Sequence, residues 1–192
     1  LADGYWVLPA TLPDYIATAK PEPITTQDEA FAEAENEIQA KIRRLLAVNG
    51  SKTVATFHRE LGHIMWDYVG MARSEESLVS ALSKIRHLRE QYWRDVRVSG
   101  GPEELNQQLE HALRVADFLE LAELMAIDAL ARDESCGAHF RVEHQTAEGE
   151  AERDDERFAY VAAWGYNGAE PPILVKEPLV YENVKLAVRS YK

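Results

Sequence analysis

The 192-residue sequence has little cysteine, no long apolar run and no excess of positive charge. Cys136 is the only cysteine, which excludes an internal disulfide and fits a reducing compartment. The net charge of −12 argues against a nucleic-acid-binding face and against attraction to anionic lipid. No stretch approaches the roughly 20 apolar residues of a membrane-spanning helix, and the N-terminus lacks the pattern of a signal peptide.

Several motifs that hold nucleotides or activate nucleophiles are also missing. The sequence contains no Gly-x-Gly-x-x-Gly, no phosphate-binding loop and no Gly-x-Ser-x-Gly elbow. It shows no internal repeat. A nucleotide or flavin site within these residues is therefore not expected.

What the sequence does contain is apolar residues at helical spacing. Hydrophobic residues make up 46% of the chain, and four stripes of them predict helices. The first helix is expected to start at Thr26, where Thr26-Gln27-Asp28-Glu29 reads as a capping box, and to end at Asn49-Gly50. The second and third are expected over about 53–69 and 75–95, with Ser74 as a cap.

The fourth helix is expected to open at Pro102 and to organise the rest of the chain. Its first half carries one apolar stripe, which includes Leu105, and its second half is apolar nearly all round. A helix that is apolar on every side must be covered on every side, so the second half is predicted to be central.

The two ends of the chain have a different character. Pro9, Pro13, Pro21 and Pro23 are expected to prevent a long helix near the N-terminus, leaving one short turn at most over 14–19. The first residues read as the tail of an element that began earlier, which indicates a piece of a longer protein. Residues 143–157 are mostly charged and predict a solvated loop.

A hairpin is predicted after that loop, from a strand over 158–164, a turn at Asn167-Gly168 and a strand over 173–176. The predicted fold is mainly α, an up-and-down bundle of three to four helices followed by a small β-hairpin and irregular appendage. Its expected divisions are a connector over 1–24, the bundle over 25–135 and a small α+β appendage over 136–192.

Three groups of residues invite a chemical interpretation. His58 and His63 are five residues apart, which is not the spacing of a zinc-binding helix pair, so two surface histidines are favoured. Cys136, His139 and His144 offer soft ligands without an obvious fourth, which leaves zinc, a reactive thiol or neither.

The third group is a set of charges after the fourth helix. Arginine binds carboxylates in a bidentate manner, so a dicarboxylate site is one interpretation. An ion-paired network that fixes the helix end is the favoured alternative. The residues are Arg132, Asp133, Glu134, Arg141, Arg153, Asp154 and Asp155.

The segment Arg132-Asp133-Glu134-Ser135-Cys136-Gly137-Ala138-His139-Phe140-Arg141 resembles the Arg-x-Glu-Ser-Arg-Gly-Ala-His-x-Arg signature of the succinate dehydrogenase/fumarate reductase flavoprotein subunit. Residues 67–73 resemble that family's turn between two bundle helices, Arg153-Asp154-Asp155-Glu156 its Arg-Asp-Asp-Glu, and 189–192 its C-terminal end. Residues 1–5 resemble the segment after the flavin domain. Cys136 departs from the usual Arg, and the acidic insert over 146–152 replaces a shorter link.

The resemblance implies an oxidoreductase of electron transport and the tricarboxylic acid cycle, whose catalytic and FAD-binding residues lie outside this chain. It implies FAD in the full-length protein, with an iron–sulfur subunit and a membrane anchor as partners at the cytoplasmic face of a bacterial inner membrane. No catalytic, cofactor-binding or metal residue is carried over to this chain, which is expected to be a brace without an active site. No nucleic acid and no direct membrane insertion are expected.

The residues expected to form the interdomain motif are Arg73, Arg132, Glu134, Ser135, His139, Arg141, Arg153, Asp154 and Asp155. The alternatives are the C-terminal region of an L-aspartate oxidase, which shares the flavin fold, and a helical adaptor without enzymatic activity. The predicted hairpin and tail favour the dehydrogenase.

Overall fold

The computed structural model describes residues 1–20, 22–168 and 171–187. The chain divides into two units, Leu1–Lys41 and Ile42–Lys192, which are described separately. In the first unit a π-helical turn, η1 (Asp3–Val7), runs into α1 (Leu8–Ala19), and α2 (Glu29–Val48) begins after it. The described residues of 1–40 are exposed.

The prediction that the prolines leave at most one short helical turn near the N-terminus is wrong, because α1 is 12 residues long. Pro9 lies in the first turn of α1, where its missing N–H is not needed, and Pro13 lies inside the helix. Pro13 removes one internal hydrogen bond, and water can replace it because the segment is exposed. The helix ends at Ala19, and Lys20 after it adopts the left-handed conformation at φ 40°.

The start and end of α2 also differ from the prediction. Asp28 Oδ2 accepts from the Thr25 N–H at 2.5 Å, so Thr25 and Asp28 take the role expected of Thr26 and Glu29. At the other end Asn49 adopts the left-handed conformation, at φ 47°. Gly50 serves close packing instead, because a Cβ there would lie 2.0 Å from the Asp95 carbonyl oxygen.

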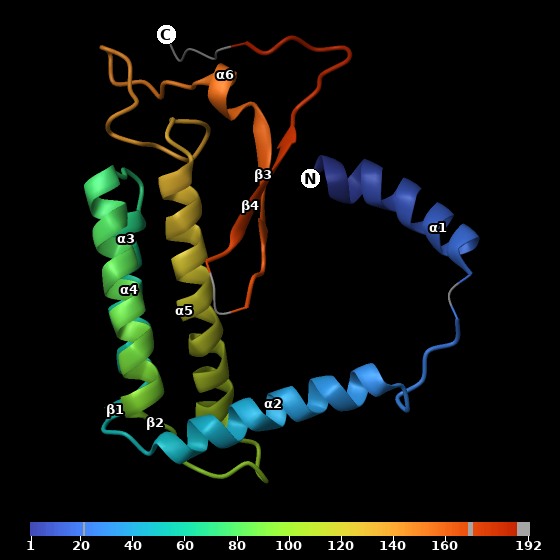
Figure 1. Ribbon diagram of the computed structural model, residues 1–192, viewed down its shortest axis with the longest axis vertical. Coiled ribbons are helices and arrows are strands. Elements are labelled where there is room, and N and C mark those ends of the chain that lie inside the picture. Colours follow the sequence, from blue (N-terminus) through green and yellow to red (C-terminus); the bar gives the residue numbers. More distant parts are fainter. Residues whose placement is uncertain (21, 169–170, 188–192) are drawn as a thin grey trace. The chain divides into compact units, whose positions relative to one another are not determined.

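In the second unit α3 (Val54–Val69), α4 (Glu75–Asp95) and α5 (Gln107–Ala131) lie side by side and run up, down and up (Figure 1). Thr53 caps α3, and Ser74 caps α4 through a reciprocal capping box with Ser77. The predicted helical bundle followed by a hairpin is therefore confirmed.

The start of α5 was predicted five residues too early. The side chain of Asn106 accepts from the amides of Gln108 and Leu109, so the helix begins after Asn106 and not at Pro102. Leu105, expected in the apolar stripe, is 98% exposed. The second half of α5 is not covered on every side as predicted, since Leu121 and Met125 are about half exposed.

The core lies between α3, α4 and α5, with Leu45 from the last part of α2. Tyr92 is fully buried there and its hydroxyl donates to the Ala112 carbonyl at 2.6 Å. The fully buried members with the largest side chains are Tyr92, Phe57, Leu45, Leu78, Ile85 and Leu119.

Two pairs of short strands accompany the bundle. The sequence did not indicate β1 (Lys52–Thr53) and β2 (Val96–Arg97), which pair in parallel at one end. Beyond α5, the short helix α6 (Asp155–Phe158), also not predicted, leads into β3 (Tyr160–Gly165) and its antiparallel partner β4 (Ile173–Pro178). Trp164 Nε1 donates to Asp128 of α5 at 2.7 Å and so ties the hairpin to the bundle.

Within the described part of the chain, no helix combines the length and the apolar character needed to cross a bilayer.

Candidate functional site

The loop over 132–144, which we call the elbow, follows α5 at the end of the bundle where α3 turns into α4 (Figure 1). It pairs with the α3–α4 turn through the backbone. The Arg73 N–H donates to the Phe140 carbonyl at 3.0 Å, and the Val142 N–H donates to the Arg73 carbonyl at 2.8 Å. The structure thereby joins two segments that the sequence singled out 66 residues apart.

Arg141 is the centre of the elbow, with a side chain only 2% exposed. Its Nη1 donates to the carbonyls of Ala129 and Leu130, at 3.3 and 3.5 Å, which are among the last acceptors of α5. Its Nε donates to Glu143 at 3.2 Å, and its Nη2 lies 3.6 Å from Asp133. The buried guanidinium group is thus bonded to the end of α5 and also paired with carboxylates.

Glu143 extends this contact to α4. One carboxylate oxygen accepts from Arg141 and the other accepts from the Glu75 N–H at 2.6 Å, in the first turn of α4. Burial alone raises the pKa of Glu143, but the hydrogen bonds from Glu75 and Arg141 outweigh it and lower that pKa. The carboxylate is therefore held in its charged form.

Ser135 fixes the shape of the elbow. It is fully buried, and its hydroxyl both accepts from the Arg141 N–H at 2.8 Å and donates to the Arg141 carbonyl at 3.1 Å. Between these residues Cys136 and His139 exchange backbone hydrogen bonds around a tight turn. Gly137 takes φ 59° in that turn, which favours glycine.

The tautomer of His139 follows from its neighbours. Its Nδ1 lies 2.8 Å from Arg73 Nη1, and arginine can only donate, so Nδ1 accepts. Its Nε2 therefore carries the proton and donates to the Arg132 carbonyl at 2.8 Å. Burial, followed by the charges of Arg73 and the other arginines, lowers the pKa of His139. The ring is neutral and bridges two turns.

Arg132 and Glu134 attach the hairpin to the elbow. Arg132 donates to Glu134 at 2.8 Å and to the carbonyls of Phe158 and Tyr160 at 3.2 and 3.1 Å. Glu134, 3% exposed, accepts from the Asp154 N–H at 2.9 Å with its other oxygen. Asp154 in turn caps α6 by accepting from the Arg157 N–H.

The remaining predicted residues lie at the rim. Arg153 and Asp155 form a bidentate pair at 2.9 and 2.6 Å, and Arg153 also donates to the Ala187 carbonyl. Asp133 accepts from His144 Nε2 at 2.5 Å, which is the largest cause of its lowered pKa. The predicted solvated loop over 143–157 is thus partly ordered by ion pairs, and the family-like end over 189–192 lies outside the described residues.

This arrangement favours a network over a substrate site. The guanidinium groups of Arg73, Arg132 and Arg141 all donate to groups of the chain itself, and in the described residues no buried side-chain nitrogen or oxygen lacks a partner. A dicarboxylate would have to displace these contacts.

The soft ligands considered for zinc are not arranged as a set. Both nitrogens of His139 are hydrogen-bonded, His144 binds Asp133, and Cys136 is exposed. No cluster of three or more histidine, cysteine or acidic side chains suited to a metal occurs in the part of the chain that the structure covers.

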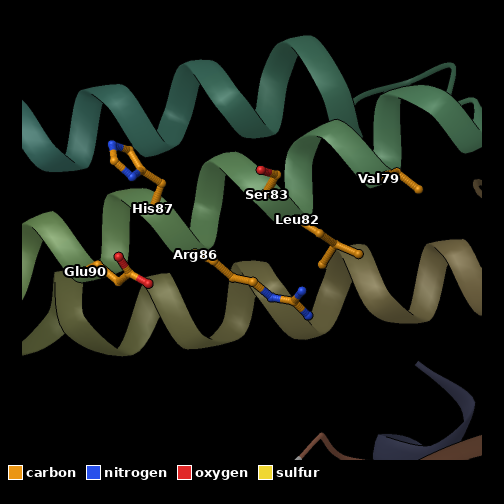
Figure 2. Close-up of a pocket in the computed structure, with 6 residues that line it drawn as sticks. All are labelled: Val79, Leu82, Ser83, Arg86, His87 and Glu90. Carbon is orange, nitrogen blue, oxygen red and sulfur yellow. The ribbon is translucent and has the colours of Figure 1, made fainter.

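One surface hollow, of about 510 Å³, lies at the rim of the elbow and is lined by His144 and residues 152–157. Another, of about 390 Å³, is lined only by α4 residues, among them Val79, Arg86 and Glu90 (Figure 2). In Figure 2 these side chains spread along one helix and do not converge on a common point. The hollow is a groove beside α4 and lacks the arrangement of a catalytic centre.

One contact between histidines was not predicted from the sequence. His58 of α3 was compared with His63, but its partner is His111 of α5, with His58 Nδ1 3.2 Å from His111 Nε2. The two residues are 53 positions apart, so only the packing of α3 on α5 brings them together.

Comparison with known proteins agrees with this geometry. The family described as "Fumarate reductase flavoprotein C-term" matches residues 58–191. The fumarate reductase flavoprotein subunit of Haemophilus influenzae is 26% identical, over 93% of this chain and 28% of its own length. A structure of the Escherichia coli quinol fumarate reductase flavoprotein superposes with a TM-score of 0.73 at 27% identity, over 91% of this chain and 28% of that one.

L-aspartate oxidase of Synechocystis is also similar, at 26% identity over 63% of this chain and 23% of its own length. The chain spans less than a third of the length of these relatives. The matched residues include the α3–α4 turn, the elbow, α6 and the hairpin. The chain belongs to the fumarate reductase flavoprotein C-terminal family.

Proposed function

We propose that this chain is the helical C-terminal region of a succinate dehydrogenase or fumarate reductase flavoprotein subunit and braces that subunit's flavin domain. The observation that carries the proposal is the family match over 58–191 together with an elbow whose charges are satisfied within the chain. The complete protein would interconvert succinate and fumarate. This chain would contribute stability and docking and no reacting group.

FAD does not fit the residues of this chain. The sequence has no glycine-rich phosphate loop, and the arginines of the elbow already donate to carbonyls and carboxylates. We infer that FAD is bound by a part of the protein outside these residues. An iron–sulfur subunit and a membrane anchor, at the cytoplasmic face of a bacterial inner membrane, are the partners that this assignment predicts.

The charged side chains of the elbow are already paired within the chain, so the tip is the part of the elbow that can contact a neighbouring domain. Its arginines face inward, whereas Cys136, Gly137 and Ala138 are exposed. The exposed apolar side chains of the first unit, including Trp6 and Phe31, need a covering surface as well. We therefore assign docking on the flavin domain to the tip and to the first unit, and assign the charged network to holding the bundle end rigid.

Flavin content tests the assignment. The chain alone should purify without flavin absorbance, whereas the complete protein should carry FAD and turn over succinate or fumarate. A stoichiometric flavin in the chain alone would contradict the proposal. Turnover of L-aspartate without fumarate reduction would favour the L-aspartate oxidase alternative, which the similarity to the Synechocystis enzyme keeps open.

A tip variant separates docking from folding. Ala138→Glu places a charge on the exposed tip, so the melting temperature of the chain should stay within about 2 °C because surface substitutions cost little. FAD retention in the complete protein should fall. Ala55→Glu, on the exposed side of α3, is the matched control and should leave both unchanged. Full FAD retention in Ala138→Glu would remove the tip from the interface.

A further inference from the structure

We propose that His58 of α3 and His111 of α5 form a two-histidine site for a divalent transition-metal cation, such as Zn²⁺ or Ni²⁺, that clasps the two helices together. The site lies outside the elbow and does not depend on the activity of the complete protein. It rests on the facing nitrogens of the two rings and on the packing that holds them.

The separation of the nitrogens fits shared coordination. Metal–imidazole bonds are about 2.0–2.1 Å long, so two such ligands at angles between about 90° and 109° place their nitrogens about 2.8–3.4 Å apart. His58 Nδ1 and His111 Nε2 are 3.2 Å apart, with ring centroids 5.3 Å apart and the rings at 77°. A small rotation of both side chains is enough to aim the two lone pairs at one point.

The surrounding packing keeps the two rings in place. Their helices are locked by buried neighbours of each histidine, Phe57 on α3 and Ala112 on α5. The ring of Phe118 lies 5.5 Å from that of His58 and limits its motion. Metal binding by these two rings needs little reorganisation of the protein. Reorganisation is the main cost of forming a metal site from flexible side chains.

Coordination replaces the existing hydrogen bond without net proton release. In that bond one of the two facing nitrogens carries a proton. On metal binding this ring shifts its proton to its other nitrogen, and both facing nitrogens offer lone pairs to the cation. Imidazole suits Zn²⁺, Ni²⁺ and Cu²⁺. No third protein ligand is available among the described residues, so water completes the coordination and the site is open.

The test is calorimetric titration of the complete protein, without an affinity tag, with NiCl₂ and ZnCl₂ at pH 7.5. We expect one equivalent to bind and the melting temperature to rise by several degrees, because a ligand that binds only the folded state stabilises it. His58→Ala and His111→Ala should each lose this event, and alanine is well tolerated in helices. His63→Ala, at an exposed position of α3, should retain it.

A wild-type protein that binds no metal at pH 7.5, or binding that persists unchanged in His58→Ala or His111→Ala, would overturn the proposal. Loss of binding in His63→Ala alone would overturn it as well, because the ligands would then be elsewhere.

Discussion

Replacement of Arg141 is the sharpest test of the elbow as a structural lock. The side chain is 2% exposed, and Arg141→Ala removes its contacts with the α5 carbonyls and with Glu143 together. Glu143 is 38% exposed and can recruit water, but the Ala129 carbonyl belongs to a buried residue and cannot. Leaving that carbonyl without a donor costs about 1–3 kcal/mol, and the cavity left by a large buried side chain adds about 2 kcal/mol or more, so a total of about 3–5 kcal/mol is expected.

That free energy corresponds to a large fall in melting temperature. For a domain of this size about 2–4 °C is lost per kcal/mol, so Arg141→Ala should melt about 6–20 °C below wild type. Arg141→Lys keeps the charge but has no planar fork to reach the helix end and Glu143 at once. The melting temperature of Arg141→Lys should therefore lie between those of the wild type and Arg141→Ala.

Two variants make the measurement decisive. Arg114→Ala removes an exposed arginine that pairs with Glu110 on the surface of α5, and should cost less than about 1 kcal/mol. Arg141→Met keeps most of the volume without the charge, so a Met variant as unstable as Ala assigns the loss to the hydrogen bonds. Thermal and urea unfolding followed by circular dichroism give the values. An Arg141→Ala protein no less stable than Arg114→Ala would refute the lock.

Three further outcomes are expected. The pKa of His139 lies below its ordinary 6.5, so the unfolded chain binds more protons than the folded protein near that pH. The stability that the neutral ring contributes is therefore present above pH 6.5 and is lost as the pH falls toward the folded pKa. His139→Gln should flatten the pH dependence of urea unfolding in that window, and an unchanged slope would count against the neutral bridge. Ser135→Ala should lower the free energy of unfolding by about 1–3 kcal/mol because two buried hydrogen bonds to Arg141 are lost, and an unaffected urea midpoint would contradict this. Gly50→Ala should cost more than about 2 kcal/mol in the same assay because its Cβ meets Asp95, whereas Gly62→Ala, with open space around it, should be neutral or stabilising.

The helices of the bundle were predictable because their signals are local. The apolar spacing and the caps at Thr53 and Ser74 fix α3 and α4 within a residue of the prediction. The start of α5 was missed because two local signals competed. Pro102 is typical of a first helical position, but Asn106 caps the helix and its amide donates to the carbonyls of Ser99 and Gly101.

The elbow was only half predictable. The sequence singled out its residues, but not which of them pair, because the partners come from different elements. Arg73 and His139 meet only after α4 and α5 have packed, and His58 and His111 meet only after α3 has packed on α5. Trp164, which belonged to the predicted strand, gave no sign that it would bind Asp128. Side-chain pairing across the bundle is set by packing geometry and not by spacing along the chain.

The signs of the elbow charges follow from the topology of the bundle. Because the helices run up, down and up, the C-terminal ends of α3 and α5 meet the N-terminal end of α4 (Figure 1). Arg73 donates to the last carbonyls of α3, at Val69 and Gly70, and Arg141 to those of α5, so each negative helix end receives a cation. Glu143 binds the first turn of α4 and supplies the anion that this positive end favours. Each such contact stabilises by about 0.3–1 kcal/mol at the surface and up to about 2 kcal/mol when partly buried. A site that had evolved to bind a dicarboxylate would leave arginine donors free, whereas here the charges match the three helix ends, which is the arrangement that a brace requires.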